Sequence, residues 1–371
     1  MEEAALPDLP RGLTRRTFLR RVAPLPLLLA AAPALGGPRR LRFGLISDVH
    51  QDVMPDGVER VGAFVADMQA SGADFIIQLG DFCQPHARNA PFLAAWNAFE
   101  GARYHVLGNH DMDGGASREK TVEFYGMPGR HYAFDAGPLR GIVLDGNDPG
   151  GRAGGYRRFI AAEQQAWLRR ELEQTDRPVC LFLHQPLDRP AAGVENGEAV
   201  RAILERAEAA RPGTVLAVFA GHFHQDYQWH AKGIPCTTNK QDRELFHKVL
   251  TLTSSGSSHW LAALPPCVQI NSASYVWLPA AAARETYPAE VHRAHPYLRR
   301  VAAYRAPLWA LATLDLDRGE LLLEGRRSEW VGPDPWERGA PEDQYPRDKS
   351  RPAISDRQLA LRHPPIAQPQ S

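Results

Sequence analysis

The sequence predicts a layered α/β fold. Short apolar runs of strand length alternate with longer segments whose apolar residues recur at spacings of three and four, as in helices that cover a sheet. Five of the apolar runs end directly at a cluster of polar residues, and in layered α/β folds ligands bind beyond the carboxyl ends of strands. The 371 residues, 44% of them hydrophobic, are enough to bury a sizeable core.

The strands that end at polar clusters lie in the first 225 residues. They are residues 41–47 leading into Asp48-Val49-His50, residues 73–79 into Gly80-Asp81, residues 104–107 into Gly108-Asn109-His110-Asp111, residues 179–183 into His184, and residues 214–220 into Gly221-His222-Phe223-His224. Between them, the helical pattern is clearest over residues 58–69, 161–174 and 198–210. A further strand is predicted over residues 141–145, and the glycine-rich loop 146–155 that follows it could border a binding site.

The second part of the chain predicts a second sheet. Residues 226–230 and 234–238 are spaced as in a hairpin, and residues 268–278, 308–316 and 320–325 are expected to be further strands. From residue 331 onward, a tail rich in proline, arginine and aspartate lacks periodicity. This composition indicates that residues 331–371 form a surface-wrapping arm or a disordered segment.

Charge and cysteine usage exclude several classes of protein. Lysine plus arginine and aspartate plus glutamate both number 43, so no global field steers nucleic acid or an anionic membrane toward the chain. Any anionic substrate must therefore be bound locally. The four cysteines lie far apart without a Cys-x-x-Cys pair, which argues against a structural zinc site or a dense disulfide framework. The sequence leaves undecided whether Cys236 and Cys267 form a disulfide bond.

The first forty residues predict export. A twin-arginine run, Arg15-Arg16, precedes the apolar residues 22–35 and the small-residue site Ala32-Pro33-Ala34, a pattern that resembles a Tat signal cleaved after Ala34. The apolar stretch is shorter than the about 20 residues of a membrane-spanning helix, so we expect no permanent membrane anchor. We therefore expect residues 1–34 to engage the Tat export machinery and the mature protein to be periplasmic or extracellular. Tat substrates fold before export, which suits an enzyme that acquires metal in the cytoplasm.

The polar clusters contain the residue types that a two-metal hydrolase needs. Hydrolysis of a phosphate ester at neutral pH requires a hydroxide, relief of negative charge on the phosphoryl oxygens and protonation of the leaving group. Two metal ions about 3.5–4 Å apart supply the first two. A site for such a pair needs a bridging carboxylate together with imidazoles and oxygen ligands around each ion.

In order and spacing, the five clusters resemble the signature of the calcineurin-like metallophosphoesterases over residues 41 to about 230. Each motif alone is weak, but five matches in order, all at strand ends, are specific. The resemblance implies a four-layer α/β/β/α sandwich of two mixed sheets flanked by helices, spanning residues 41–326. It also implies a metal-dependent phosphoric ester hydrolase.

The same resemblance implies a role for each residue. Asp48, His50 and His224 would bind the first metal, and Asn109, His184 and His222 the second. Asp81 would bridge the two ions, which the mixed nitrogen and oxygen ligands allow to be Mn, Fe, Zn or Co. The nucleophile would be a metal-bridging hydroxide. His110 would protonate the leaving oxygen, and Asp111 would orient His110 or raise its pKa.

The loops indicate the class of substrate. Four segments, 144–148, 154–156, 165–168 and 184–186, are similar to the small-molecule phosphodiesterase branch of the family, including ADP-ribose and CDP-alcohol hydrolases. We therefore expect a small nucleotide-like or phospho-alcohol diester as substrate and no nucleic-acid partner. Aromatic residues such as Tyr156, Tyr227, Trp229, Tyr275 and Trp277 could stack on a base, but we expect most of them to serve the core.

Three alternatives remain open. The chain could be a phosphomonoesterase, because the metal motifs fix the reaction type and leave the ester open. An exported nuclease would need a basic groove, which the neutral charge does not favour. A non-catalytic binding protein could keep the fold, although it would have no need of His110 and a complete bridging site.

Overall fold

The computed structural model describes residues 39–152, 154–188, 192–229, 265–277, 287–340, 342 and 346–361. The chain divides after Pro38, and all of these residues belong to the unit that begins at Arg39. The predicted signal, the hairpin arm at 234–238 and Cys236 lie outside the described residues. In the described part of the chain, no helix is long and apolar enough to cross a membrane.

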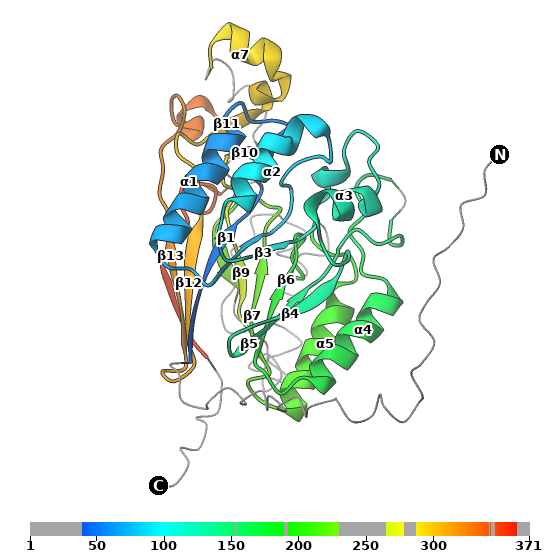
Figure 1. The fold of residues 1–371 in the computed structure, drawn as a ribbon. Coiled ribbons are helices and arrows are strands. Elements are labelled where there is room, and N and C mark those ends of the chain that lie inside the picture. The colour runs from blue at the N-terminus through cyan, green and yellow to red at the C-terminus, as the bar shows by residue number, and fades with distance from the viewer. Residues whose placement is uncertain are drawn as a thin grey trace, which may run out of the picture. The chain divides into compact units, whose positions relative to one another are not determined.

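Two six-stranded mixed sheets form the centre of the fold (Figure 1). The first contains, in spatial order, β14 (Arg357–Ala360), β13 (Glu320–Gly325), β12 (Ala310–Asp315), β1 (Arg40–Ile46), β2 (Phe75–Gln78) and β3 (Ala102–His105). The second contains β4 (Tyr132–Ala136), β5 (Leu139–Val143), β6 (Val179–Phe182), β7 (Val215–Ala220), β9 (Cys267–Gln269) and β8 (Tyr227–Trp229). A separate antiparallel pair contains β10 (Tyr275–Trp277) and β11 (Val301–Ala303).

The five strands that end at the polar clusters, β1, β2, β3, β6 and β7, all lie in the parallel parts of the two sheets. β1, β2 and β3 run parallel in the first sheet, and β5, β6, β7 and β9 run parallel in the second. The remaining neighbours pair antiparallel. Because parallel neighbours end at the same edge of a sheet, this arrangement gathers the loops that follow them.

Helices cover the outer face of each sheet. α1 (Gly57–Ala70) and α2 (Ala90–Asn97) lie over the first sheet, and α4 (Ala162–Gln174) and α5 (Gly197–Ala210) lie over the second (Figure 1). α1 turns Phe64 and Met68 into the core, and α5 does the same with Ile203 and Leu204. The other helices among the described residues are α3 (Arg118–Tyr125), α7 (Ala289–Ala294) and the short 3₁₀ turns η2 (Ala87–Asn89), η3 (His110–Met112), η5 (Pro296–Arg300) and η6 (Pro335–Arg338). The predicted sandwich of two mixed sheets flanked by helices is confirmed.

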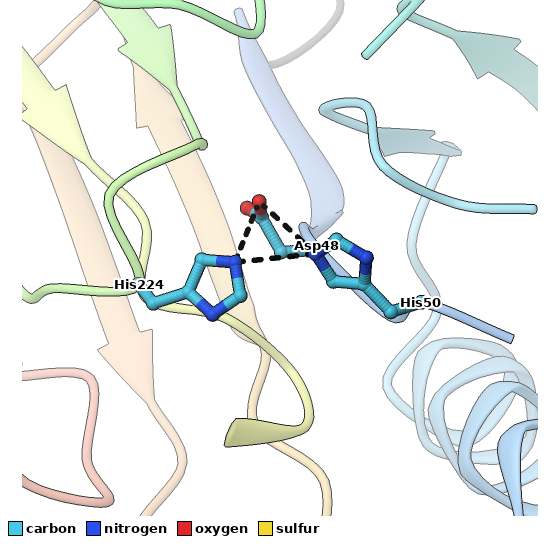
Figure 2. A group of neighbouring side chains, drawn as sticks. All are labelled: Asp48, His50 and His224. Carbon is cyan, nitrogen blue, oxygen red and sulfur yellow. Dashed lines mark hydrogen bonds and ion pairs between the residues drawn. The ribbon is translucent and has the colours of Figure 1, made fainter. Parts of the chain in front are cut away.

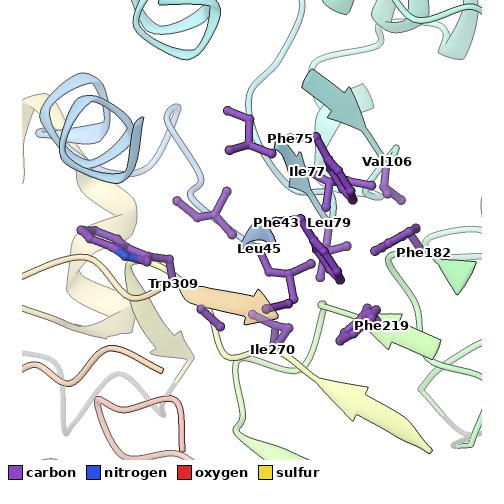
Figure 3. Packing of buried hydrophobic residues seen from close by; sticks show 14 of the residues in the cluster. Phe43, Leu45, Phe75, Ile77, Leu79, Val106, Phe182, Phe219, Ile270 and Trp309 are labelled. Carbon is purple, nitrogen blue, oxygen red and sulfur yellow. The ribbon is translucent and has the colours of Figure 1, made fainter. Parts of the chain in front are cut away.

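Aromatic side chains pack the space between the two sheets (Figure 3). Phe43 of β1 stacks on Phe75 of β2 with ring centroids 4.8 Å apart. It also meets Phe182 and Phe219 of the second sheet edge to face, at 6.1 and 5.9 Å. All four rings are fully buried. This dry aromatic layer fixes one sheet against the other, and with it the strand ends that carry the polar clusters.

The predicted single strand at 268–278 is in fact two strands in different sheets. β9 belongs to the second sheet and β10 to the separate pair, with residues 270–274 between them. The break follows from buried polar side chains that serve the loop after β1. Ser272 Oγ donates to the carbonyl of Asp48, and Ser274 Oγ donates to that of Val49, both at 2.8 Å. Such side chains compete with the ladder of a continuous strand.

In the segment after residue 330, which the sequence predicts to be a surface-wrapping arm or a disordered tail, residues 357–360 form the edge strand β14 on β13. The tail also holds the loop that breaks β9 from β10, since Asn271 donates to the carbonyls of Arg351 and Ala353 at 2.9 and 3.2 Å. Arg357 forms an ion pair at 2.5 Å with Asp226, a residue that lies two positions beyond His224. The described tail thus supports the predicted metal ligands. Its long-range pairing left no local pattern in the sequence.

We expect Arg357→Leu to destabilise the protein, because it leaves the carboxylate of Asp226, whose side chain is 2% exposed, without its cation. Breaking a buried pair from one side costs about 3 kcal/mol in free energy of unfolding. The control is Arg318→Leu, which removes an ion pair whose arginine is 75% exposed and should change that free energy by less than about 1 kcal/mol. Urea denaturation of both variants measures the difference. Equal stabilities would contradict the role given to Arg357.

Candidate metal centre

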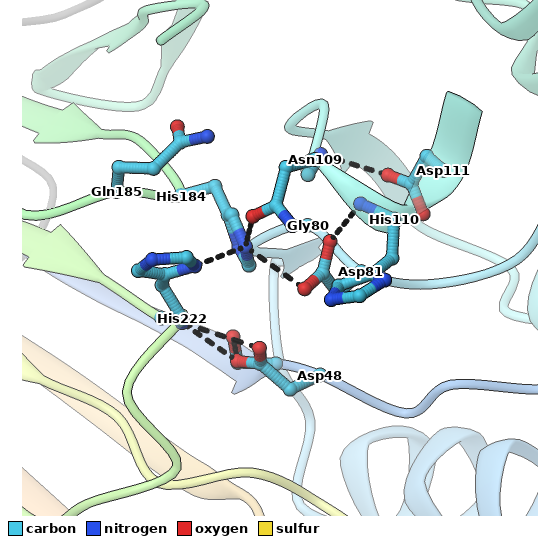
Figure 4. A network of polar contacts seen from close by, with 12 residues as sticks. Asp48, Gly80, Asp81, Asn109, His110, Asp111, His184, Gln185 and His222 are labelled. Atoms are coloured by element: carbon cyan, nitrogen blue, oxygen red, sulfur yellow. Dashed lines mark hydrogen bonds and ion pairs between the residues drawn. The ribbon is translucent and has the colours of Figure 1, made fainter. Parts of the chain in front are cut away.

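The five predicted clusters meet at the carboxyl ends of the parallel strands. Figure 4 shows Asp48 after β1, Asp81 after β2, Asn109 after β3, and His184 and His222 after β6 and β7 with their side chains converging. Backbone bonds tie the loops together: Asp48 N donates to the Gly80 carbonyl at 3.0 Å, and Gly221 N donates to the His184 carbonyl at 3.0 Å. Residues that are distant in sequence thus form one buried centre.

Asp48, His50 and His224 form the first group, as predicted from the sequence (Figure 2). Their ligand atoms all lie within 4.8 Å of one another. His224 Nε2 is 3.2 Å from Asp48 Oδ1 and 3.2 Å from His50 Nε2. All three side chains are buried.

Asp81, His184 and His222 form the second group, again within 4.8 Å. Asn109 joins it through its amide oxygen, which lies 3.1 Å from His184 Nε2. His222 Nδ1 is 3.2 Å from the same nitrogen. The loop of His222 is held to the first group, because its backbone N–H donates to Asp48 Oδ2 at 3.0 Å.

Asp81 lies between the two groups. One of its oxygens, Oδ2, is 3.1 Å from His184 Nε2 in the second group and 3.7 Å from His50 Nε2 in the first. The other oxygen, Oδ1, accepts the backbone N–H of His110 at 2.8 Å. One carboxylate oxygen therefore faces both groups, which is the geometry that a bridging ligand requires.

Backbone carbonyls set the orientation of three of the histidines. His184 Nδ1 lies 2.8 Å from the Leu79 carbonyl, His224 Nδ1 2.7 Å from that of Tyr275, and His222 Nε2 3.0 Å from that of Ala192. A carbonyl can only accept, so each of these nitrogens carries the hydrogen. The opposite nitrogen of each ring then presents a lone pair to the centre, as metal-binding histidines do.

These lone pairs face one another, and only a proton or a cation placed between them makes the arrangement favourable. Burial lowers the pKa of His50 and of His222 to about 3, which leaves both rings neutral and able to bind metal. Burial opposes a rise at His184, but the carboxylates of Asp81 and Asp48 and the Leu79 carbonyl together raise the pKa of His184 to about 9. Without a metal, His184 therefore carries a second proton on Nε2, which a bound cation would displace. The donor set fits two divalent ions of the kind that accept nitrogen and oxygen ligands.

The backbone of the ligand loops is strained. Five non-glycine residues in the described part of the chain have a positive φ, and all five are predicted ligands: Asp48, His50, Asp81, His222 and His224, with φ between 51° and 81°. The left-handed region costs about 1–3 kcal/mol at such residues, and the surrounding packing must hold it. Strain concentrated on these residues indicates that the loops are shaped for the centre and not for stability.

Glycines allow the close approach of these loops. A Cβ on Gly108 would lie 2.0 Å from the backbone nitrogen of Asp81, and a Cβ on Gly80 would lie 2.5 Å from His184 Nδ1. Both contacts are shorter than van der Waals packing permits, so each glycine is required where its motif places it.

We expect Gly108→Ala to lower metal content and activity together, because the methyl group displaces Asp81. The control is Gly62→Ala in α1, where a Cβ meets nothing within 4 Å. That change should stabilise the helix by about 0.5–1 kcal/mol and leave the metal content unchanged. Elemental analysis and thermal denaturation of the two variants provide the measurement. Full metal content in Gly108→Ala would contradict the close packing of the two loops.

His110 lies beside the metal groups with its ring part-exposed. Its Nδ1 is 2.7 Å from Asp113 Oδ2 and 3.0 Å from the Tyr156 hydroxyl, which itself donates to Asp113 Oδ1 at 2.9 Å. Burial opposes a rise in the pKa of His110, but the carboxylates of Asp81 and Asp113 raise it. With Nδ1 engaged by Asp113, the Nε2 side of the ring remains free for a substrate.

Asp113 takes the place that the sequence assigned to Asp111. Asp111 is buried and accepts the backbone N–H groups of Phe82 and Gly108 at 2.6 and 2.8 Å, so it holds two loops together and does not orient His110. The reason is the 3₁₀ turn η3, in which side chains three residues apart eclipse each other. The three-residue spacing from His110 to Asp113 is the sequence signal for this pair. It can be interpreted only if a 3₁₀ turn is recognised at residues 110–112.

The residues of the predicted substrate loops form a buried scaffold behind the centre. Gln185 donates to Asn147 Oδ1 at 3.0 Å, and Asn147 donates to Asp145 Oδ1 at 2.9 Å. Arg118 pairs with Asp145 and Asp148 at 2.8 and 2.9 Å. Apart from Gln185 Oε1, which has no hydrogen-bond partner among the described residues, these groups satisfy one another and position the chain next to His184. Tyr156 and its neighbours Gly154 and Gly155 face solvent instead.

Comparisons with known proteins give one family match and several distant structural similarities. A sequence model described as "Calcineurin-like phosphoesterase" matches residues 41–226, half of the chain. Among solved structures, the fold is similar to a dimetal phosphatase from Danio rerio at 18% identity, covering 78% of this chain and 96% of that one with a TM-score of 0.49. It is also similar to PhoD at 14% identity, covering 84% of this chain and 69% of that one with a TM-score of 0.46.

A putative 5′-nucleotidase from Staphylococcus aureus is similar at 15% identity, covering 80% of this chain and 55% of that one with a TM-score of 0.40. No curated protein matches the chain. The family match covers the five clusters, and the structure places them as two ligand groups around one carboxylate. The chain therefore belongs to the calcineurin-like phosphoesterase family and is a metal-dependent phosphoester hydrolase with a two-metal centre.

Proposed function

We propose that the protein is a phosphodiesterase that acts on small nucleotide-like or phospho-alcohol diesters. Asp48, His50 and His224 would hold one ion, and Asn109, His184 and His222 would hold the other. Asp81, which faces both groups, would be shared between them. The assignment of the two metal sites rests on the position of Asp81 Oδ2. This oxygen lies 3.1 Å from His184 Nε2 in one group and 3.7 Å from His50 Nε2 in the other. When bound, such a pair of ions polarises the phosphoryl group and lowers the pKa of water.

The side chains around the ions do the remaining work. His110 is placed to give a proton to the leaving oxygen from Nε2, since Nδ1 is bound to Asp113. Asp113 fixes the ring and stabilises its charged form. The hydrogen bond from the His110 backbone to Asp81 Oδ1 keeps this acid at a constant position relative to the bridging carboxylate.

The charge of the centre supports a diester over a monoester. Among the described residues, the ion pairs of the ligands and of His110 involve only histidines and aspartates, with no lysine or arginine. A phosphate monoester carries up to one more negative charge than a diester, and proteins bind such oxygens with arginine or lysine. If the two metal ions are the cations that contact the phosphate, the centre suits a diester, which carries less negative charge than a monoester.

The test compares two substrates on the purified protein loaded with Mn²⁺. We expect hydrolysis of bis-p-nitrophenyl phosphate with a kcat/KM at least about tenfold above that for p-nitrophenyl phosphate, the tenfold corresponding to about 1.4 kcal/mol. A preference for the monoester would replace the proposal by a phosphomonoesterase. Release of nucleotides from DNA at a higher kcat/KM than from small diesters would replace it by a nuclease.

We expect Asp113→Asn to reduce kcat about 10- to 100-fold on alkyl esters, because the asparagine cannot stabilise the charged ring of His110. Metal content should stay at two ions, since Asp113 does not contact a ligand. Nitrophenyl esters provide the control, because their leaving group departs without a proton and should be nearly insensitive. Equal losses on both classes of ester would contradict a role through His110.

We also propose that the protein is exported by the Tat machinery and that the enzyme domain begins close to residue 41. The twin-arginine run and the small-residue site at Ala34 support this, and the chain divides after Pro38. N-terminal sequencing of protein from the periplasmic fraction should find Leu35 as the first residue. Active protein that remains in the cytoplasm with an intact terminus would contradict export.

A further inference from the structure

We propose that Tyr156 and Trp277 form a stacking subsite, so that the ester carries a planar ring such as a nucleobase close to the scissile phosphate. This inference rests on the proposed function, because it takes His110 as the group next to the leaving oxygen. The subsite specifies the chemical group attached to the leaving oxygen, namely a planar ring.

Both aromatic rings adjoin the same imidazole. The ring of Tyr156 lies 4.7 Å from that of His110, and the ring of Trp277 lies 6.3 Å away at an interplanar angle of 24°. Trp277 also lies 6.4 Å from His50 and 6.3 Å from His224 of the first metal group. Both rings are therefore near enough to contact a group attached to the oxygen that His110 protonates.

The exposure of Tyr156 is the second observation. Its side chain is 46% exposed, one of two large hydrophobic residues in the described part of the chain that are open to solvent. Its hydroxyl is already used, because it bonds to Asp113 and His110. These bonds account for the hydroxyl and not for the exposure of the ring. An exposed aromatic face beside a catalytic group is typical of a ligand contact.

The two rings are held in different ways. Trp277 is half-buried and fixed edge to face on Tyr275, with centroids 5.2 Å apart at 85°. Tyr156 follows a loop in which Gly150, Gly151, Gly154 and Gly155 all have positive φ. A rigid indole paired with a tyrosine on a glycine-rich loop can accept planar groups of different size, since stacking uses the face that every nucleobase has.

The experiment measures competition by adenosine 5′-monophosphate and by ribose 5-phosphate, which share the phosphate and differ in the base. With the Mn²⁺ enzyme hydrolysing bis-p-nitrophenyl phosphate, the nucleotide should inhibit at least about tenfold more strongly. The ratio of the two inhibition constants, ribose 5-phosphate over nucleotide, should persist in Tyr156→Phe, which keeps the ring. It should fall toward one in Tyr156→Ala and in Trp277→Ala. Tyr104→Leu, which removes a half-buried tyrosine stacked on Phe134, serves as the control and should keep the ratio.

Three outcomes would overturn the subsite: a ratio near one in the wild-type protein, a ratio unchanged in both alanine variants, or an equal loss of affinity for both ligands, which a purely structural role predicts. If the protein does not hydrolyse the diester, the proposed function fails while the subsite stays testable. Calorimetric binding of the two phosphates to the Mn²⁺ protein then gives the same ratio without turnover.

Discussion

Asp81→Asn should remove most of the bound metal and nearly all activity. The substitution keeps the size of the side chain, but it replaces a charged oxygen with an amide. Asp81 Oδ2 faces His184 at 3.1 Å and His50 at 3.7 Å, so the loss is felt by both ligand groups. A metal that stabilises charge in the transition state lowers the activation free energy by several kcal/mol. Its loss therefore reduces kcat about a thousandfold or more.

Elemental analysis and steady-state kinetics test this result together. We expect metal content to fall from two ions toward one or none, with kcat reduced in parallel. The matched control is Asp135→Asn, in an ion pair whose carboxylate is 47% exposed on β4, which should leave both quantities unchanged. A variant of Asp81 that retained two ions and normal kcat would show that Asp81 does not bridge them.

His110→Ala should behave differently, because it should keep both ions while losing rate. The alanine retains the backbone N–H that donates to Asp81 Oδ1, so the bridging carboxylate stays in place. What disappears is the imidazole held by Asp113, and a general acid contributes about 10²–10⁴-fold. The loss should be largest for alkyl esters and smallest for nitrophenyl esters, whose leaving group departs without a proton.

A plot of log kcat against the pKa of the leaving group measures this difference. The slope should be steeper in His110→Ala than in the wild-type protein. The control is His295→Ala at the end of α7, a histidine that belongs to neither ligand group, which should keep both slope and metal content. An unchanged rate on alkyl esters would exclude His110 as the acid, and loss of metal would make it part of the centre instead.

The ligand set could be predicted because each of its parts is local. A buried parallel strand followed by Asp-x-His or Gly-Asp is readable within a few residues, and parallel strands end at one edge. The glycines of these motifs are explained only by the structure. Gly108 and Gly80 lie where a Cβ would strike Asp81 or His184. The sequence contains the residue, and the packing of loops far apart in the chain supplies the reason.

What could not be predicted depends on long-range pairing or on the local path of a loop. β14 pairs with β13 through residues without strand alternation, and Arg357 finds its partner Asp226 far back in the chain. The partner of His110 was placed one residue after it and lies three residues after it, because η3 is a 3₁₀ turn. Predicting either would require the tertiary contacts that stabilise these segments.

Two metal ions are expected in two ligand groups joined by Asp81. A crystal structure of the Mn²⁺ protein with an anomalous difference map would show them. We expect two peaks about 3.5–4 Å apart, one bound by Asp48, His50 and His224, the other by Asn109, His184 and His222. Asp81 should bind both. A single peak, or two peaks of which only one contacts Asp81, would contradict this expectation.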